Sequence, residues 1–387
     1  MASAGISGDY QAMLKELYPN DTPAMVAAKN RPWLAMVPKR DGFYGDVSIV
    51  PVQYEYNPGR STTFSTAQTY AASTKQVKFV NTSAHDYQVV QIDDELSEAS
   101  KNDAGSFVSA RKNEIDMALV NLGRSASASL YGSGSGALGR VLSVASDVVT
   151  LTNASDAGNF GVGMYIQASA TDGTGSLLEN DTVIVESVDE DAGTVTFTTA
   201  LSSISGATTN SYLFQAGDYG SKMKGLAAWI PLTAPVAGSD SFFSVDRGVH
   251  PRRLAGVRVN STSNSPRQNV LTLAEQIRKN GGDPDIGFCS HETFTAIVND
   301  LGTNVQYKDS GNAAIGFSGI EVRTSGGVVD MYPDPDCPAN RMYVLTKNSW
   351  YLHHLNGFPQ IVSTDGKVAQ RQASIDGIEI RCRYYAQ

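Results

Sequence analysis

The chain has 387 residues, of which 41% are hydrophobic, and it carries a formal net charge of −9 with a sequence pI near 5.1. This length can bury two or three hydrophobic cores, and no window approaches the roughly 18 consecutive apolar residues that cross a bilayer. The acidic balance disfavours a protein that holds nucleic acid by neutralising phosphates, although it leaves room for a surface that merely faces DNA.

Residues 1–45 are predicted to form an N-terminal arm. The start, MASAGISGDYQAML, lacks a basic region followed by an apolar one, so we expect no secretory signal. Residues 6–18 have the spacing of a short helix with one apolar face, after which Pro23, Pro32 and Pro38 prevent a continuous helix. The apolar residues between these prolines have little to pack on, so the arm should lie along something else.

Residues 46–92 are predicted to form a long hairpin. Its strands are expected over residues 46–57, which end in an Asn-Pro-Gly-Arg turn, and over residues 76–92. The stretch between them is polar, free of acidic residues and without a clear period. Because a lone two-stranded hairpin is marginal in water, a neighbour should support it, and that neighbour could belong to another chain.

Residues 93–136 contain the clearest helical signal, which predicts a helix over 103–131 that ends at Gly132. Apolar residues recur there at intervals of 7, 4, 3, 4 and 4 positions, which places them on one helical face. They are Val108, Ile115, Leu119, Leu122, Ala126 and Leu130. At 1.5 Å per residue the helix would be about 40 Å long, which is long enough to span a whole domain.

Residues 137–217 differ from the rest of the chain in charge and composition. They hold nine acidic residues and one basic residue, Arg140, so their net charge is −8, whereas the other 306 residues hold 29 basic and 30 acidic side chains. The segment contains no Pro, Trp, Cys, His or Lys. Two similar stretches, starting at Ser143 and Ser187, each read as a hairpin. We predict an inserted acidic β domain, either a small barrel or a sandwich.

Residues 218–364 return to mixed α/β texture, and residues 365–387 end the chain in two strands. Helices are predicted over 269–280 and 291–302, with a short buried strand between them. Further strands follow as GIEVRTS, MYVLTKN and WYLHHL, separated by loops such as MYPDPDCPAN. The final strands are expected in KVAQRQASI and GIEIRCRYY, and the whole pattern indicates an α+β fold.

Four groups of residues match parts of known chemical motifs, but each has a structural interpretation that we favour. Residues 134–139, GSGALG, match a dinucleotide fingerprint, yet a helix precedes them and a strand follows, the reverse of the required context. Cys289 with His291 lacks a second ligand pair, and His353 and His354 should face opposite sides of a strand. Asp334 and Asp336 alternate with prolines in a turn without a calcium-loop pattern. Cys289, Cys337 and Cys382 are expected to be reduced and buried.

No catalytic residue, cofactor site or metal site is predicted, so we expect no enzyme. Two clusters of basic residues are interpreted as solvated or interface-paired charge rather than as a nucleic-acid site. Lys75 and Lys78 on the hairpin are interpreted as solvated, with an isopeptide crosslink to an Asn of another subunit as the alternative. The basic clusters are Lys29, Arg31, Lys39 and Arg40, and Arg247, Arg252, Arg253 and Arg258.

The order of these parts resembles the major capsid proteins of tailed bacteriophages, which have the Hong Kong 97-like fold. The resemblance is carried by the proline-broken arm, the polar-tipped hairpin, the long helix, the stretch EQIRKNGGDPDIGFCSHETFTAIV and the ending GKVAQRQASIDGIEIRCRYYAQ. It implies an N-arm (1–45), an E-loop hairpin (46–92), a spine helix and peripheral domain (93–136), an inserted domain (137–217), an axial-domain region with a return to the peripheral domain (218–364) and C-terminal peripheral-domain strands (365–387).

The same resemblance implies a structural protein of the virion, made in the host cytoplasm. Its subunits would assemble into hexamers and pentamers of an icosahedral head shell that encloses double-stranded DNA without sequence-specific binding. Partners would be the chain itself, a separate scaffolding protein, a portal and a decoration protein, with no membrane. Alternatives are an encapsulin-like nanocompartment shell and, from another class, a β-rich carbohydrate-binding or hydrolytic protein.

Overall fold

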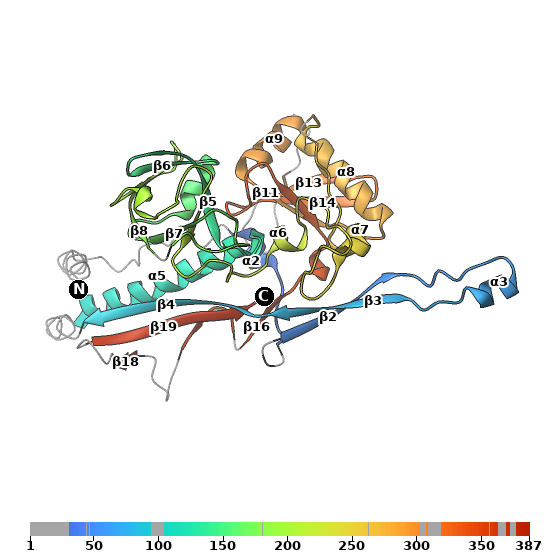
Figure 1. Cartoon of the computed structure of the whole chain (residues 1–387), viewed down its shortest axis with the longest axis horizontal. Coiled ribbons are helices and arrows are strands. Elements are labelled where there is room, and N and C mark those ends of the chain that lie inside the picture. The colour runs from blue at the N-terminus through green and yellow to red at the C-terminus, as the bar shows by residue number, and fades with distance from the viewer. Residues whose placement is uncertain are drawn as a thin grey trace.

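The structure, a computed structural model, is elongated: a two-part body lies on one side of a layer of long elements, and a hairpin projects from one end (Figure 1). The body consists of a closed barrel and a lobe of helices around a mixed sheet. Among the helices that the structure describes, none is long and apolar enough to cross a membrane. The structure describes residues 31–43, 45, 47–93, 104–179, 181–261, 263–301, 307–308, 319–355, 357–362, 369–371 and 377–387.

Helix α5 (Ala104–Tyr131) and two ten-residue strands, β4 (Ala84–Asp93) and β19 (Gly377–Ala386), form the long layer (Figure 1). β4 and β19 pair antiparallel along their whole length. The helix predicted over 103–131 is confirmed, and the N–H of Gly132 donates to the Ala128 carbonyl oxygen in its last turn.

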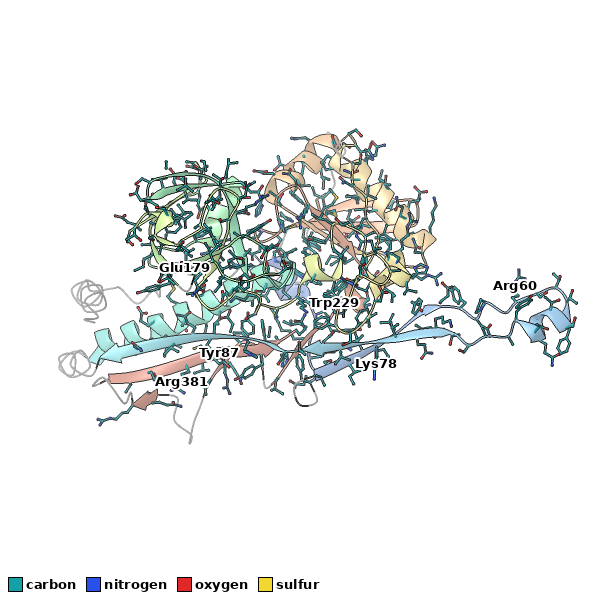
Figure 2. All side chains as sticks on the ribbon, viewed as in Figure 1. Arg60, Lys78, Tyr87, Glu179, Trp229 and Arg381 are labelled. Carbon is teal, nitrogen blue, oxygen red and sulfur yellow. The ribbon has the colours of Figure 1, made fainter. Side chains whose placement is uncertain are left out.

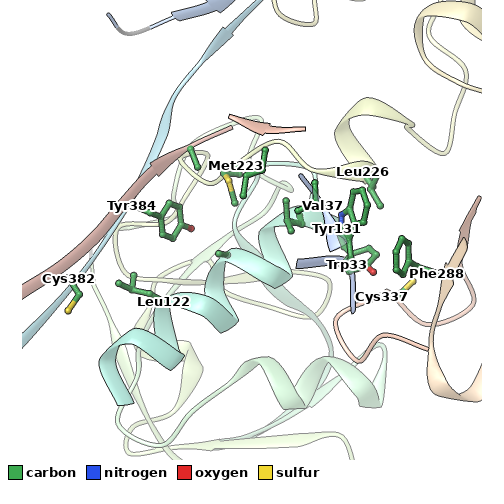
Figure 3. Packing of buried hydrophobic residues seen from close by; sticks show 14 of the residues in the cluster. Trp33, Val37, Leu122, Tyr131, Met223, Leu226, Phe288, Cys337, Cys382 and Tyr384 are labelled. Carbon is green, nitrogen blue, oxygen red and sulfur yellow. The ribbon is translucent and has the colours of Figure 1, made fainter. Parts of the chain in front are cut away.

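One face of α5 supplies much of the largest hydrophobic core. The predicted apolar face is confirmed for its described side chains, whereas the side chain of Val108 lies outside them. Figure 3 shows Leu122 of this face and Tyr131 at the end of α5 among buried side chains from other parts of the chain. Burial of a leucine-sized side chain stabilises a fold by about 1.5–3 kcal/mol. The buried and half-buried residues of the face are Ile115, Leu119, Leu122, Ala126 and Leu130.

The hairpin consists of β2 (Val47–Glu55) and β3 (Lys75–Thr82), which pair antiparallel. The prediction of one strand over 76–92 was wrong, because the chain leaves the hairpin at Ser83 and continues as β4 in another sheet. In that sheet β4 buries Val90 and Ile92 in the core around α5. An isolated hairpin would leave these side chains without such apolar burial. The tip, predicted without regular structure, contains the short helix α3 (Phe64–Thr69).

Strands β5 to β10 close into a barrel in the order β10-β5-β6-β9-β8-β7, so the barrel alternative is confirmed. The two predicted hairpins are present as β5–β6 and β8–β9. Valine, isoleucine, leucine and phenylalanine side chains fill the interior. The bounds are β5 (Ala137–Ala145), β6 (Val148–Leu151), β7 (Tyr165–Ser169), β8 (Val183–Asp189), β9 (Thr194–Phe197) and β10 (Tyr212–Gln215).

The lobe contains a sheet in the order β12-β13-β14-β11-β15 beside helices α8 (Pro266–Lys279) and α9 (His291–Leu301). Strand β14 (Gly327–Pro333) was missed, since its last three residues were assigned to a loop. It is a strand because it pairs in parallel with β11 and buries Val329 and Met331. The other strands are β11 (Ile286–Cys289), β12 (Tyr307–Lys308), β13 (Gly319–Thr324) and β15 (Met342–Leu345).

Short elements connect these parts. Of the two predicted C-terminal strands, the second is β19, and the first is described only over β18 (Ala369–Arg371), which pairs with it. The helix predicted over 6–18 lies outside the described residues. The remaining helices of the described residues are α2 (Pro32–Met36), α6 (Leu226–Trp229), α7 (Pro251–Leu254) and the 3₁₀ turns Ala154–Asn159, Leu201–Ser203, Arg247–Val249 and Lys347–Ser349. The remaining strands are β1 (Lys39–Asp41), β16 (Leu352–His354) and β17 (Gln360–Ile361).

Candidate assembly interface

The hairpin is mounted on the body at its base and unsupported at its tip. Half-buried apolar side chains of β2 and β3, together with buried Phe79, pack on Trp229, Phe242 and Phe243 of the segment that follows the barrel. Tyr56, Phe64 and Tyr70 in the tip are instead 72%, 82% and 69% exposed. Exposed aromatic side chains gathered on one projection are typical of a surface that another molecule covers.

The base ends at a charged joint. Arg253 donates from Nη1 to the Tyr54 carbonyl oxygen at 2.6 Å and to a Glu55 carboxylate oxygen at 3.2 Å. His250 Nε2 lies 3.7 Å from the other oxygen of Glu55. These contacts fix the backbone up to Glu55, so the tip begins at Tyr56.

Arg247 anchors the surface on which the hairpin base rests. Its side chain is buried, and Nε and Nη2 donate to the two carboxylate oxygens of Asp240 at 2.7 and 3.2 Å. Nη1 donates to the Ala228 carbonyl oxygen at 2.8 Å, and the guanidinium stacks 3.9 Å from the centre of the Phe242 ring. Hydrogen bonds from Arg247 lower the pKa of Asp240. Arg247 was predicted, with its basic cluster, to be solvated or paired at an interface, but it pairs with Asp240 inside its own chain.

Asp334 and Asp336 hold the segment around α2 on the lobe. The Arg31 guanidinium lies 2.6 Å from Asp336, and the Trp33 N–H donates to Asp334 at 3.1 Å. The Asp336 N–H closes the turn by donating to Asp334 at 3.0 Å, which confirms the predicted turn. The Trp33 ring packs against Phe288 (Figure 3), and their ring centres are 5.0 Å apart.

The pKa of Asp334 is raised to about 6, mainly because burial penalises the charged carboxylate. In the unfolded chain the pKa of Asp334 is near 4, so below about pH 4 the carboxyl is protonated in both the folded and the unfolded state. There the stabilisation from its raised folded-state pKa is complete. This stabilisation is lost as the pH rises through 6, where the folded state gives up the proton. We therefore expect the unfolding free energy to fall by about 2–3 kcal/mol from this group between pH 4 and pH 7. Asp334→Asn should flatten that part of the curve, as urea titrations at several pH values would measure, and an unchanged slope would contradict the assignment.

The layer of β4 and β19 holds a buried polar cluster on the face toward α5. Asp86 accepts hydrogen bonds from Ser125 at 2.5 Å and from Tyr384 at 3.2 Å, and the Lys222 ammonium lies 2.7 Å away. Lys222 also lies 3.0 Å from Asp218. Because Lys222 follows the barrel in sequence, this cluster ties the exit of the barrel to the long layer. Sequence reasoning missed it, since Asp86 and Tyr384 are 298 positions apart.

The structure separates most of the motif residues singled out in the sequence. His353 faces Ser48, with 2.6 Å between Nδ1 and Oγ, whereas His354 faces Asp41 at 2.9 Å. Residues 134–139 connect α5 to the barrel, with a helix before and a strand after. All three cysteines are buried and free, as predicted. Among the described residues no cluster of His, Cys, Asp and Glu could hold a metal ion.

Comparisons with known proteins point to one class. The model of a family described as "SU10 major capsid protein" matches residues 202–373, less than half of the chain. A solved structure, "Cyanophage A-1(L) capsid asymmetric unit", matches with a TM-score of 0.52 at 12% identity, covering 96% of this chain and 93% of that chain. No curated protein matches in sequence. At such low identity the structural likeness concerns the fold alone.

The fold is therefore that of a phage capsid subunit. Within this class, the family match and the structural match together support a phage major capsid protein, as the resemblance in the sequence implied.

Proposed function

We propose that this chain is the shell subunit of a tailed phage with a Hong Kong 97-like fold, and that it assembles into hexamers and pentamers around double-stranded DNA. The projecting hairpin, with Tyr56, Phe64 and Tyr70 exposed, carries the proposal. The hairpin base already packs on its own body, so the tip gains apolar burial, at about 25 cal/mol per Å², only when a neighbouring subunit covers it. Many modest contacts repeated over a closed lattice then stabilise the shell.

In this proposal the parts have the roles that the resemblance implied. Residues 1–45 are the N-arm, 46–92 the E-loop, 93–136 the spine region, 137–217 the insertion, 218–364 the axial region with its return, and 365–387 the last peripheral strands. The role is structural, without catalysis or cofactor. A scaffolding protein, a portal and a decoration protein are proposed as separate partners, and synthesis is proposed in the host cytoplasm.

Electron microscopy and sedimentation of the expressed chain, with and without a scaffolding protein, test this function. Icosahedral particles that package DNA in infected cells are expected. Particles that enclose protein cargo instead would favour the encapsulin-like alternative. A chain that stays monomeric at every ionic strength would contradict the shell proposal and favour the carbohydrate-binding alternative.

We propose that the barrel is an insertion. Its entry and exit lie side by side, because the Gly220 N–H donates to the Ser135 carbonyl oxygen at 2.7 Å and the Gly225 N–H to that of Gly132 at 3.1 Å. Gly225 is required there, since a Cβ would lie 2.2 Å from the Leu130 carbonyl oxygen. The barrel also has a hydrophobic cluster of its own.

Replacing residues 137–217 by a short Gly/Ser linker is expected to leave a folded subunit. The closely spaced ends need little linker, and the core around α5 loses no buried member. Circular dichroism and limited proteolysis of the variant would measure this. Global unfolding of the variant would refute the insertion.

A further inference from the structure

The hairpin tip is positively charged and has no acidic residue to compensate it. Residues 56–85 contain no Asp or Glu, and their cations are Arg60 in the tip, Lys75 opposite Glu55 and Lys78 on β3 nearer the body (Figure 2). All three side chains are exposed. The carboxylate at the joint, Glu55, already binds Arg253. The tip thus offers cations and exposed aromatic rings to another molecule.

The barrel offers the opposite charge. Its only basic residue, Arg140, donates to the Asn210 carbonyl oxygen and lies over the Tyr212 ring. Within the part of the chain that the structure describes, no barrel carboxylate takes part in a salt bridge. Most of these carboxylates are exposed, among them Glu179, Asp181, Asp189, Glu190 and Asp191.

The tip and the barrel of one chain cannot meet. Figure 2 shows Arg60 at the far end of the hairpin and Glu179 on the barrel toward the other end of the long axis. Identical copies arranged head to tail would bring the tip of each one toward the barrel end of the next, and such heterologous contacts form a ring when the rotation between copies closes. Opposite charges on the two surfaces would steer this contact and fix its register.

We propose that the hairpin tip of one subunit binds the acidic barrel of the next subunit, through Arg60 and Lys75. This inference rests on the proposed shell function and names the partner surface of the hairpin. In this proposal the negative charge of the barrel binds the hairpin of the neighbouring subunit in the ring.

Charge reversal and charge exchange test the contact. Arg60→Glu/Lys75→Glu is expected to slow assembly at low salt by about tenfold or more, because charged association rates depend steeply on complementarity. The matched control Arg267→Glu/Lys279→Glu makes the same charge change on exposed positions of α8 and should stay within about twofold of the unmodified chain. Adding Glu179→Lys/Asp181→Lys to the hairpin variant should restore much of the rate. Light scattering with electron microscopy measures all four proteins.

Zero-length carbodiimide crosslinking, which joins a lysine to a carboxylate, gives a second readout on the unmodified protein. Peptides that join Lys75 to a barrel carboxylate of another copy are expected. The contact is overturned if this lysine links only to carboxylates outside the barrel, or if the hairpin variant assembles like its control. Either result would refute only the contact between hairpin and barrel, provided that the unmodified chain forms shells. If the unmodified chain forms no shells, the shell proposal itself is contradicted.

Discussion

Arg247→Ala is expected to lower the free energy of unfolding by about 3 kcal/mol, the lower end of the range for removing one member of a buried ion pair, because Arg247 is buried but Asp240 is only partly buried. The substitution leaves the Asp240 carboxylate without its bidentate partner and the Ala228 carbonyl oxygen without its donor. It also removes the cation that stacks on Phe242. Urea denaturation followed by circular dichroism would measure the change.

Two variants separate the ion pair from a general effect of charge. Arg247→Lys keeps the charge but cannot form the two parallel hydrogen bonds, so it should restore only part of the stability. Arg252→Ala removes an exposed charge nearby and should change stability by no more than about 0.5 kcal/mol. Equal effects of Arg247→Ala and Arg252→Ala would refute the anchoring role. Because the anchor supports the hairpin base, hydrogen exchange in β2 and β3 should also accelerate in Arg247→Ala.

Trp33→Ala is expected to cost about 3–5 kcal/mol, the usual range for truncating a large buried aromatic side chain. Trp33 is 2% exposed and packs between Phe288 and Trp350, with ring centres 5.0 and 6.4 Å away. Its loss would open a cavity where α2 joins the lobe. The midpoint of urea denaturation by far-ultraviolet circular dichroism measures the effect without relying on tryptophan fluorescence.

Phe64→Ala provides the control for aromatic truncation. Phe64 is 82% exposed in the hairpin tip, so its removal should leave the stability of the subunit within about 0.5 kcal/mol. If the tip is an assembly surface, the same variant should form shells more slowly. A large loss of subunit stability in Phe64→Ala would mean that the tip packs on its own chain.

Helices and hairpins that depend on residues close in sequence were predicted correctly. The apolar spacing from Ile115 to Leu130 and the glycine after Tyr131 gave α5 within one residue at each end. The repeated strand–turn–strand pattern similarly predicted the β5–β6 and β8–β9 hairpins. Both inferences succeed because helix periodicity and tight turns depend on residues a few positions apart.

The structure differs from the predictions where a strand or a charged residue has a partner far away in the sequence. β4 was predicted as part of the hairpin because it continues β3 in sequence, yet its partner is β19, nearly 300 residues later. β14 looked like a loop until its parallel neighbour β11 supplied hydrogen bonds and burial. Arg247 and Asp334 looked like solvated charges or turn residues, and only the folded chain showed their buried partners.

By itself, the sequence determined the long helix, the acidic β segment and the order of parts that resembles a phage capsid protein, since these depend on local periodicity and composition. The tertiary structure decided which strand pairs with which and which charges are buried. Those outcomes depend on residues that only folding brings together, where the free energy of burial and pairing exceeds local preference.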